Sequence, residues 1–319
     1  MKIIQSLISF VTRFLPILIV LFSIIAYVWP HHFTSIQGLT GFCLGLIFFL
    51  MGITLSTEQI MSVIKNPKYA FIGFLLKWTI TVGFSLVIAY LFFKNNPELA
   101  AGVILAGIVP SGTSANLYTF IAGGEAALSI TMATLDTIIA PVITPLIAEL
   151  SIGKVIEINT LGLFINIILI VFVPLFLGLF VQWKFPKQVA HVKPYTSIVS
   201  QIALLTVVLS VVSKAQATLQ ENLQYLPLIF IAVTLQVIVP MFIGYLIASI
   251  MRIDYKYVIA ISFHTGICNT ALSATLASEH ICAIAAVPAV ANMIVNLTIG
   301  AIVARMFSRR MNKTVLALE

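Results

Sequence analysis

Charged residues are scarce in this chain, and their scarcity excludes a water-soluble domain. Lys, Arg, Asp and Glu together make up 8% of the 319 residues, whereas a soluble domain carries about 25%. Hydrophobic residues reach 61%, and the mean hydropathy is +1.13. This composition predicts an all-α polytopic membrane protein, because only helices and closed barrels satisfy their backbone groups inside a lipid bilayer.

Cysteine is also rare, and the three cysteines predict neither a disulfide framework nor a metal site. Cys43, Cys268 and Cys282 lie in apolar runs and lack the spacing of metal ligands. We therefore expect no metal and no bound cofactor. The chain also has no HExxH motif and no pair of membrane aspartates, so we do not expect an enzyme.

Long apolar runs are abundant, and ten of them are candidates to cross a bilayer, which takes about 20 residues. The inner segments carry thirteen Lys and Arg residues, whereas the outer loops carry only Lys94, Lys154 and Lys214. This positive-inside bias predicts a multi-pass protein of the plasma (inner) membrane with both termini in the cytoplasm. The net charge of +7 is concentrated on that side, so no nucleic-acid partner is expected. The ten runs cover residues 13–29, 39–57, 69–93, 98–122, 126–149, 159–182, 196–213, 227–250, 257–277 and 281–306.

The fourth run contains a polar interruption at its centre. Residues 107–116 read GIVPSGTSAN, in which Pro110 removes an amide donor and Gly112 relaxes the backbone. Backbone freed at this depth must line a cavity or be buried in protein, because lipid offers no hydrogen bonds. The interruption alone is consistent with a kinked helix or with a broken helix that forms a binding site.

A second interruption favours the binding site. The ninth run is broken by polar residues from His264 to Thr270, and Gly112 and Asn116 match Gly266 and Asn269 within one residue of spacing. Paired breaks in the two halves of a chain are typical of the substrate site of secondary transporters.

The paired breaks also predict an internal repeat. We place its halves at residues 1–152 and 153–319, with five spans each, so the second half is inverted in the membrane. FIGFLLK at residues 71–77 resembles FIAVTLQ at residues 230–236, at the same relative place in the two halves.

Three ionisable residues, Lys77, Asp136 and His264, fall inside the predicted spans at the depth of the breaks. At about 1.5 Å per residue they lie roughly 12, 16 and 10 Å from the inner ends of their spans. A Lys or Asp at the centre of a span costs about 2.5–3.5 kcal/mol to insert, so we expect each to face a cavity or a partner. A Lys77–Asp136 ion pair is allowed, either as a purely structural contact or as part of the mechanism. His264 is likewise either a hydrogen-bonded interior residue or a functional one.

Three segments of the chain resemble the bile acid:sodium symporter family, as a bacterial homologue of the bile acid and organic anion transporter type. They are MGITL at residues 51–55, VILAGIVPSGTSANLYTFIAGGEAALS at 103–129 and TGICNTALSATLA at 265–277. The resemblance implies ten transmembrane helices in a 5+5 inverted repeat, with helices 4 and 9 broken and crossing. It also implies a core domain built from spans 3–5 and 8–10 and a panel domain built from spans 1–2 and 6–7.

Members of that family usually bind two sodium ions beside the crossing, and this chain departs from their pattern. Asn116 and Ser129 keep the residue types that the resemblance implies. At five other positions this chain has a different residue from the one that the resemblance implies. Lys77 replaces a glutamine, Ala115 a serine, Ala133 a threonine, His264 a glutamate and Cys268 a glutamine. Asp136 adds a carboxylate nearby. The loss of the glutamate and the gain of an ammonium predict that sodium coupling is altered or absent.

The breaks place the substrate at the crossing, where amides and half-helix N-termini favour an anion. Thr113, Ser114, Asn116 and Asn269 are the expected binding residues, because their uncharged side chains can donate hydrogen bonds to a carboxylate. The resemblance alone adds Asn296. The leading hypothesis is a secondary active transporter that moves a small organic anion, bile acid-like or a small carboxylate, by alternating access.

Other mechanisms stay open at this stage. The alternatives to the leading hypothesis are a sodium-coupled symporter, as in the family, and a non-transporting membrane sensor. Desolvation favours the neutral form of a lysine and histidine titrates near neutrality, so Lys77 and His264 are either proton-coupling groups or fixed features of a facilitator. The motifs specify neither the substrate, the direction of transport nor the oligomeric state.

Overall fold

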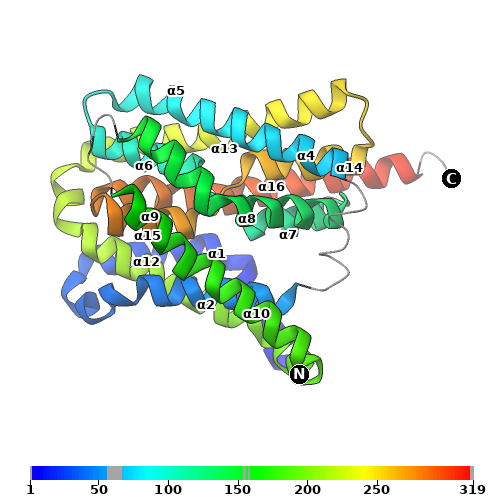
Figure 1. Cartoon of the computed structure of the whole chain (residues 1–319), viewed down its shortest axis with the longest axis horizontal. Coiled ribbons are helices and arrows are strands. Elements are labelled where there is room, and N and C mark those ends of the chain that lie inside the picture. The colour runs from blue at the N-terminus through cyan, green and yellow to red at the C-terminus, as the bar shows by residue number, and fades with distance from the viewer. Residues whose placement is uncertain (1, 56–66, 154–155, 157–158, 317–319) are drawn as a thin grey trace.

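The computed structural model describes residues 2–55, 67–153, 156 and 159–316, and it describes side chains in these ranges from Phe14 to Met311. The described residues form a bundle of helices (Figure 1). Seven of its helices are long and apolar enough to cross a membrane, as judged by length and composition. They cover Pro30–Thr54, Pro67–Phe93, Ala126–Ser151, Thr160–Lys184, Pro186–Glu221, Leu223–Ile250 and Ile284–Met311.

All ten apolar runs of the sequence coincide with helices. The first five runs correspond to α1 (Lys2–Val28), α2 (Thr40–Thr54), α4 with α5 (Pro67–Leu76 and Val82–Phe93), α6 with α7 (Pro97–Gly107 and Thr113–Ile121) and α8 (Ala126–Ser151). The other five correspond to α9 with α10 (Thr160–Ile167 and Val173–Lys184), α12 (Thr196–Glu221), α13 (Leu226–Ile250), α14 with α15 (Tyr255–Gly266 and Thr270–His280) and α16 (Val287–Leu316). Short π-helices, η2 (Lys77–Thr81) and η3 (Ile168–Phe172), join α4 to α5 and α9 to α10.

Three connections differ from the sequence-based expectation. The connection between the first two runs, which carries His31 and His32, is a 3-10 helix, η1 (Pro30–Leu39). The inner connection after Lys184 contains a further helix, α11 (Pro186–Val192). The placement of Lys214 in an outer loop was wrong, because α12 continues for seven residues beyond it. Lys65, Lys154 and most of the expected boundary between the halves lie outside the described residues.

Helices α1, α2, α10 and α12 pack against one another along one side of the bundle (Figure 1). The tightest contact joins α2 to α10 through two glycines. A Cβ atom on Gly52 would lie 2.3 Å from the carbonyl oxygen of Leu175, and one on Gly178 would lie 2.2 Å from that of Phe49. Such close backbone approach between apolar helices requires small residues at the contact.

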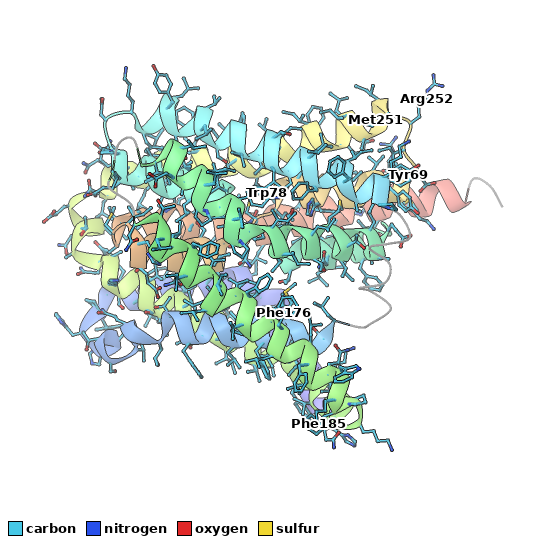
Figure 2. The ribbon with its side chains drawn as sticks, in the orientation of Figure 1. Tyr69, Trp78, Phe176, Phe185, Met251 and Arg252 are labelled. Carbon is cyan, nitrogen blue, oxygen red and sulfur yellow. The ribbon has the colours of Figure 1, made fainter. Side chains whose placement is uncertain are left out.

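Helices α4 to α8 and α13 to α16 form a second group, which contains the two broken helices, α6 with α7 and α14 with α15. The two groups meet where α15 contacts α2 and α12 and where α16 contacts α1. Large apolar side chains lie on the outer surface, and Figure 2 labels three of the exposed ones, Phe176, Phe185 and Met251. Phe42, Leu91, Phe120 and Leu161 are each about two thirds exposed or more, which is the expected outer face of a protein solvated by lipid.

Candidate functional site

Both polar interruptions are breaks between helices, and the two breaks lie against each other. Helix α6 ends at Gly107 and α7 begins at Thr113, while α14 ends at Gly266 and α15 begins at Thr270. The amide of Gly112 donates to the carbonyl of Ile267 at 3.2 Å, and the amide of Asn269 donates to the carbonyl of Pro110 at 2.8 Å. These bonds form a short antiparallel bridge between Ser111 and Cys268. Each unwound segment therefore satisfies backbone groups of the other, as burial at this depth requires.

Glycine is required at the crossing for steric reasons. A Cβ atom on Gly112 would lie 2.8 Å from the carbonyl oxygen of Cys268 in the opposite segment. A Cβ atom on Gly266 would lie 2.5 Å from the Cβ of Met241 on α13. The sequence match between these two glycines thus reflects the same need in both halves, which is the close approach of two backbones.

The carboxylate of Asp136 on α8 is completely buried beside the crossing and accepts three contacts. Its Oδ1 accepts a hydrogen bond from Nε1 of Trp78 at 2.8 Å, and its Oδ2 accepts one from the amide of Ser111 at 3.0 Å. Nε2 of His264 lies 3.3 Å from the same Oδ2. Asp136 therefore connects α8 to the first unwound segment, to η2 and to α14. Trp78, Ser111 and His264 in turn give the buried carboxylate the polar partners that it needs.

Lys77 is also fully buried, but its ammonium faces the second unwound segment. Nζ of Lys77 donates to Sγ of Cys268 at 2.8 Å and reaches the carbonyl oxygen of Gly107 at 3.5 Å. Lys77 is the first residue of η2, and π-helical turns inside α-helices occur frequently at functional sites. In the next turn of this span, the hydroxyl of Thr81 donates to the carbonyl of Thr265 at 2.5 Å, which fixes the span against α14.

The Lys77–Asp136 ion pair that the sequence allows does not form, because Nζ of Lys77 contacts Cys268 and Gly107 instead. In the part of the chain that the structure describes, the ion-pair contact of Asp136 is with His264. The charge of Lys77 still acts electrostatically on both Asp136 and His264. The three buried ionisable groups thus form one cluster at the crossing, in which Asp136 lies with His264 and Lys77 contacts Cys268.

The two positions that keep the residue types of the sodium-binding pattern contact each other. The hydroxyl of Ser129 donates to Oδ1 of Asn116 at 2.7 Å, and the hydroxyl of Thr119 donates to Oγ of Ser129 at 3.3 Å. Ala115 and Ala133 are both buried and present methyl groups. The oxygen atoms of the Asn116–Ser129 pair are therefore engaged with each other, and two of the remaining positions offer no side-chain oxygen.

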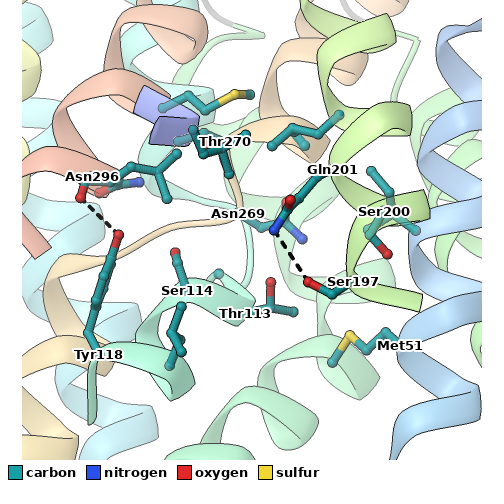
Figure 3. A pocket seen from close by; sticks show the side chains of 18 of the residues that line it. Met51, Thr113, Ser114, Tyr118, Ser197, Ser200, Gln201, Asn269, Thr270 and Asn296 are labelled. Carbon is teal, nitrogen blue, oxygen red and sulfur yellow. Dashed lines mark hydrogen bonds between the residues drawn. The ribbon is translucent and has the colours of Figure 1, made fainter. Parts of the chain in front are cut away.

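A cavity of about 740 Å³ lies between the crossing and the helices α1, α2 and α12 (Figure 3). Thr113, Ser114, Asn269 and Asn296 line it, so the structure brings four of the five expected substrate residues together. Asn116 is not among the lining residues, and its side chain bonds Ser129 instead. Asn116 projects from a different face of α7 than Thr113 and Ser114, so the structure does not bring it to this cavity with the other four residues.

The polar groups at the crossing end of the cavity differ in how many of their hydrogen-bonding atoms have partners. Oδ1 of Asn269 accepts the amide of Leu272 at 3.2 Å and caps α15. Nδ2 of Asn296 donates to the carbonyl of Cys268 at 3.2 Å, whereas its Oδ1 has no partner among the described residues. The first residue of α7, Thr113, follows Gly112, which provides no side-chain cap. The uncapped amides and the hydroxyls of Thr113 and Ser114 make this end of the cavity favourable for an anion.

Sequence reasoning missed the opposite wall of the cavity. Ser197, Ser200 and Gln201 line it from α12, and Arg305 lines it from α16. The three α12 residues are spaced i, i+3 and i+4, so they share one face of an apolar helix. That spacing could have indicated a polar face on this helix. Arg305 had been counted only as one of the inner positive charges.

A second buried polar network was also missed. Nε2 of Gln236 on α13 donates to Oγ of Ser85 at 2.7 Å and to the carbonyl of Val103 at 2.8 Å. Its Oε1 accepts from Nδ2 of Asn292 on α16 at 2.8 Å. Gln236 aligns with Lys77 when residues 71–77 are compared with residues 230–236. That alignment could have singled out Gln236 as a buried polar residue. The network fixes α5, α6, α13 and α16 around the breaks.

Comparison with known proteins bears on what this site is for. The model of the Sodium Bile acid symporter family matches residues 41–222, which is more than half of the chain. The chain belongs to this family. It is 33% identical to the uncharacterized sodium-dependent transporter YocS of Bacillus subtilis, over 98% of this chain and 96% of that protein. It is 30% identical to the probable sodium/metabolite cotransporter BASS1 of Arabidopsis thaliana, over 88% and 68% of the two chains. It is 25% identical to the human sodium-dependent organic anion transporter, over 75% and 64%.

Membership confirms several expectations from the sequence. The resemblance to the family was correct, and the family consists of transporters rather than enzymes. The apolar helices and the bacterial relative indicate a multi-pass protein of the plasma membrane.

Proposed function

We propose that this protein is a secondary transporter that moves a small organic anion, bile acid-like or a small carboxylate, by alternating access and without sodium. The observation that carries the proposal is the pairing of two broken helices beside an uncharged polar wall. Transporters that bind an anion at mid-membrane use such half-helix ends, where free amides and the helix dipole favour negative charge. The names of the relatives support the substrate class, since one is a metabolite cotransporter and another an organic anion transporter.

The architecture we propose is a 5+5 inverted repeat of ten transmembrane helices, with halves at residues 1–152 and 153–319 and both termini in the cytoplasm. The core domain would contain spans 3–5 and 8–10, and the panel domain would contain spans 1–2 and 6–7. The packing of α1, α2, α10 and α12 as one group supports this division. The cavity lies between the two proposed domains, so relative movement of the domains would open it alternately to the two sides of the membrane.

The proposal of sodium independence is based on Lys77. Its ammonium bonds Cys268 and reaches Gly107, and positions 77 and 268 are two at which the family resemblance implies glutamine oxygens for sodium. A sodium ion about 4 Å from this ammonium would meet a repulsion of roughly 4 kcal/mol at an effective dielectric constant near 20. That repulsion corresponds to roughly a thousandfold loss of affinity. The relatives named as sodium-dependent make sodium coupling the competing possibility.

Transport into proteoliposomes tests both parts of the proposal. Purified protein should first be screened by thermal shift against carboxylate metabolites, with sodium and pH varied independently. Uptake of the best ligand should saturate and should not change when potassium or choline replaces sodium at constant pH. Saturable stimulation by millimolar sodium would contradict sodium independence. Binding without uptake would instead indicate a sensor, and a rate that follows an imposed pH gradient would indicate proton coupling through the Asp136–His264–Lys77 cluster.

A further inference from the structure

Arg305 places a positive charge in a cavity that otherwise has uncharged walls. The cavity is lined by apolar and uncharged polar residues from six helices, and Arg305 on α16 is the one lining residue among those described with a formal charge. Neither Asp nor Glu lines the cavity in the described part of the chain. Among the described residues that line the cavity, Arg305 therefore carries the one formal charge, and this charge favours an anion there.

The guanidinium of Arg305 is available for a ligand. Among the described residues, no hydrogen bond or ion pair reaches it, and its side chain is exposed. Its neighbour Arg310 differs, since NH1 of Arg310 lies 3.4 Å from the hydroxyl of Tyr245 and the guanidinium lies 5.5 Å from the ring centre of Tyr255. Arg309 is exposed but is not a lining residue. Of these three arginines, Arg305 alone lines the cavity.

Helix geometry directs Arg305 toward the crossing. Met293, Leu297, Ala301 and Arg305 recur every four residues and line the same cavity, as expected for one face of a helix. Arg305 follows Asn296 by nine residues, or about 13 Å along the helix axis. Long helical side chains tend to lean toward the N-terminus, which on α16 is the direction of Asn296 and the crossing.

The cavity thus has two separate regions that attract anions. At the crossing, Thr113, Ser114, Asn269 and Asn296 offer uncharged donors, and Arg305 offers a charged fork at the other end. Most of the other lining residues are apolar, and Phe48, Leu117 and Leu204 are among them. A ligand with a single carboxylate can occupy one of these regions but cannot satisfy both.

We propose that Arg305 is a second anion-binding point, and that the cavity selects an elongated organic anion with two acidic groups joined by an apolar chain. One carboxylate binds the donors at the crossing, as in the proposed function on which this inference rests. The other pairs with Arg305, whose planar fork matches a carboxylate through two parallel hydrogen bonds. The apolar chain between them packs against Phe48, Leu117 and Leu204.

A chain-length series of dicarboxylates tests the proposal. Full-length protein in nanodiscs is titrated with unbranched α,ω-dicarboxylates from four to ten carbons and with the monocarboxylates of equal length, using calorimetry or thermal shift. We expect one dicarboxylate length to bind roughly tenfold to hundredfold tighter than its monocarboxylate partner, as for a hydrogen-bonded charge pair. Arg305→Gln should remove this preference, because it should weaken the binding of the preferred dicarboxylate much more than that of the monocarboxylate of equal length.

Two variants control for charge and for folding. Arg309→Gln removes the same charge one turn further along α16, away from the cavity, and should keep the wild-type preference. Arg305→Lys keeps the charge but loses the bidentate fork, so it should retain part of the preference. Both variants alter exposed side chains, so folding should be unaffected.

Other outcomes would contradict the proposal. Equal loss of affinity for both ligand series in Arg305→Gln would mean that Arg305 attracts anions only through its field. Equal binding of both series by the wild-type protein would show that no second anion-binding point exists. If monocarboxylates bind and dicarboxylates gain nothing, the proposed function stands and this inference fails. If neither series binds, the proposed function fails, and the second point with it.

Discussion

The ammonium of Lys77 lies 2.8 Å from the Sγ of Cys268, a residue 191 positions away in the chain, and both side chains are buried. The contact joins the π-helical turn η2 to the second unwound segment. In the family resemblance both positions are glutamines beside a sodium ion. We therefore propose that Lys77 puts a covalently attached cation where the resemblance implies that ion, and sodium binding becomes a test of Lys77.

Replacing Lys77 should reveal whether its charge excludes sodium. In Lys77→Gln the repulsion disappears while Asp136 remains, so sodium should raise the melting temperature of the variant but not of the wild-type protein. Lys77→Arg keeps the positive charge and should stay insensitive. The measurement is thermal unfolding in detergent as sodium replaces choline at constant ionic strength. A sodium response in the wild-type protein would count against the idea.

Asp136 should be essential for the stability of the crossing. Asp136→Asn keeps one carbonyl oxygen but cannot accept from both Trp78 and the Ser111 amide in the present geometry. Because a lost hydrogen bond to a charged group costs about 1.5–3 kcal/mol, the melting temperature should fall by several degrees. Trp78→Phe removes one hydrogen-bond donor to Asp136 and leaves the Ser111 contact intact. It should therefore reduce uptake less than Asp136→Asn does. Wild-type stability and uptake in Asp136→Asn would show that the carboxylate is dispensable.

Gly112 should tolerate no side chain. Gly112→Ala places a Cβ atom 2.8 Å from the Cys268 carbonyl, so the two unwound segments must move apart. Overpacking of this kind costs about 1–3 kcal/mol, and substrate affinity should fall because Thr113 and Ser114 move too. Gly83→Ala is the matched control, since a Cβ atom there meets nothing within 4 Å. Equal behaviour of the two variants in thermal unfolding and ligand binding would contradict this account.

Asn269 should have two separable roles. It caps α15 through Oδ1 and it lines the cavity. Asn269→Ala should lower stability by about 1 kcal/mol, as for other lost N-caps, and should also weaken ligand binding. Asn269→Ser keeps a capping oxygen but loses the amide, so its melting temperature should stay near wild type while affinity falls. Asn116→Ala should change affinity less than either, because Asn116 does not line the cavity. The comparison requires melting curves and ligand titrations of the same preparations.

The sequence by itself determined the membrane class, the ten apolar runs and the two breaks. These features are local: a run of apolar residues must be helical in lipid, and Pro110, Gly112 and Gly266 interrupt such a run wherever it packs. The depth of Lys77, Asp136 and His264 also followed from counting residues along each span. The cavity residues at the two breaks were predictable for the same reason, since polar residues that interrupt an apolar run are visible in the sequence, whereas those on α12 and Arg305 were missed.

The tertiary structure decided which of these residues touch. Depth along a helix does not fix rotation about its axis, and each residue turns the side-chain direction by about 100°. Helix packing, together with the π-helical turn that begins at Lys77, therefore decided that Asp136 contacts His264 and that Lys77 contacts Cys268. The same rotation turns Asn116 toward Ser129 and away from the cavity. Arg305 was visible only as an inner positive charge, and its place in the cavity depends on how α16 packs against the neighbouring helices.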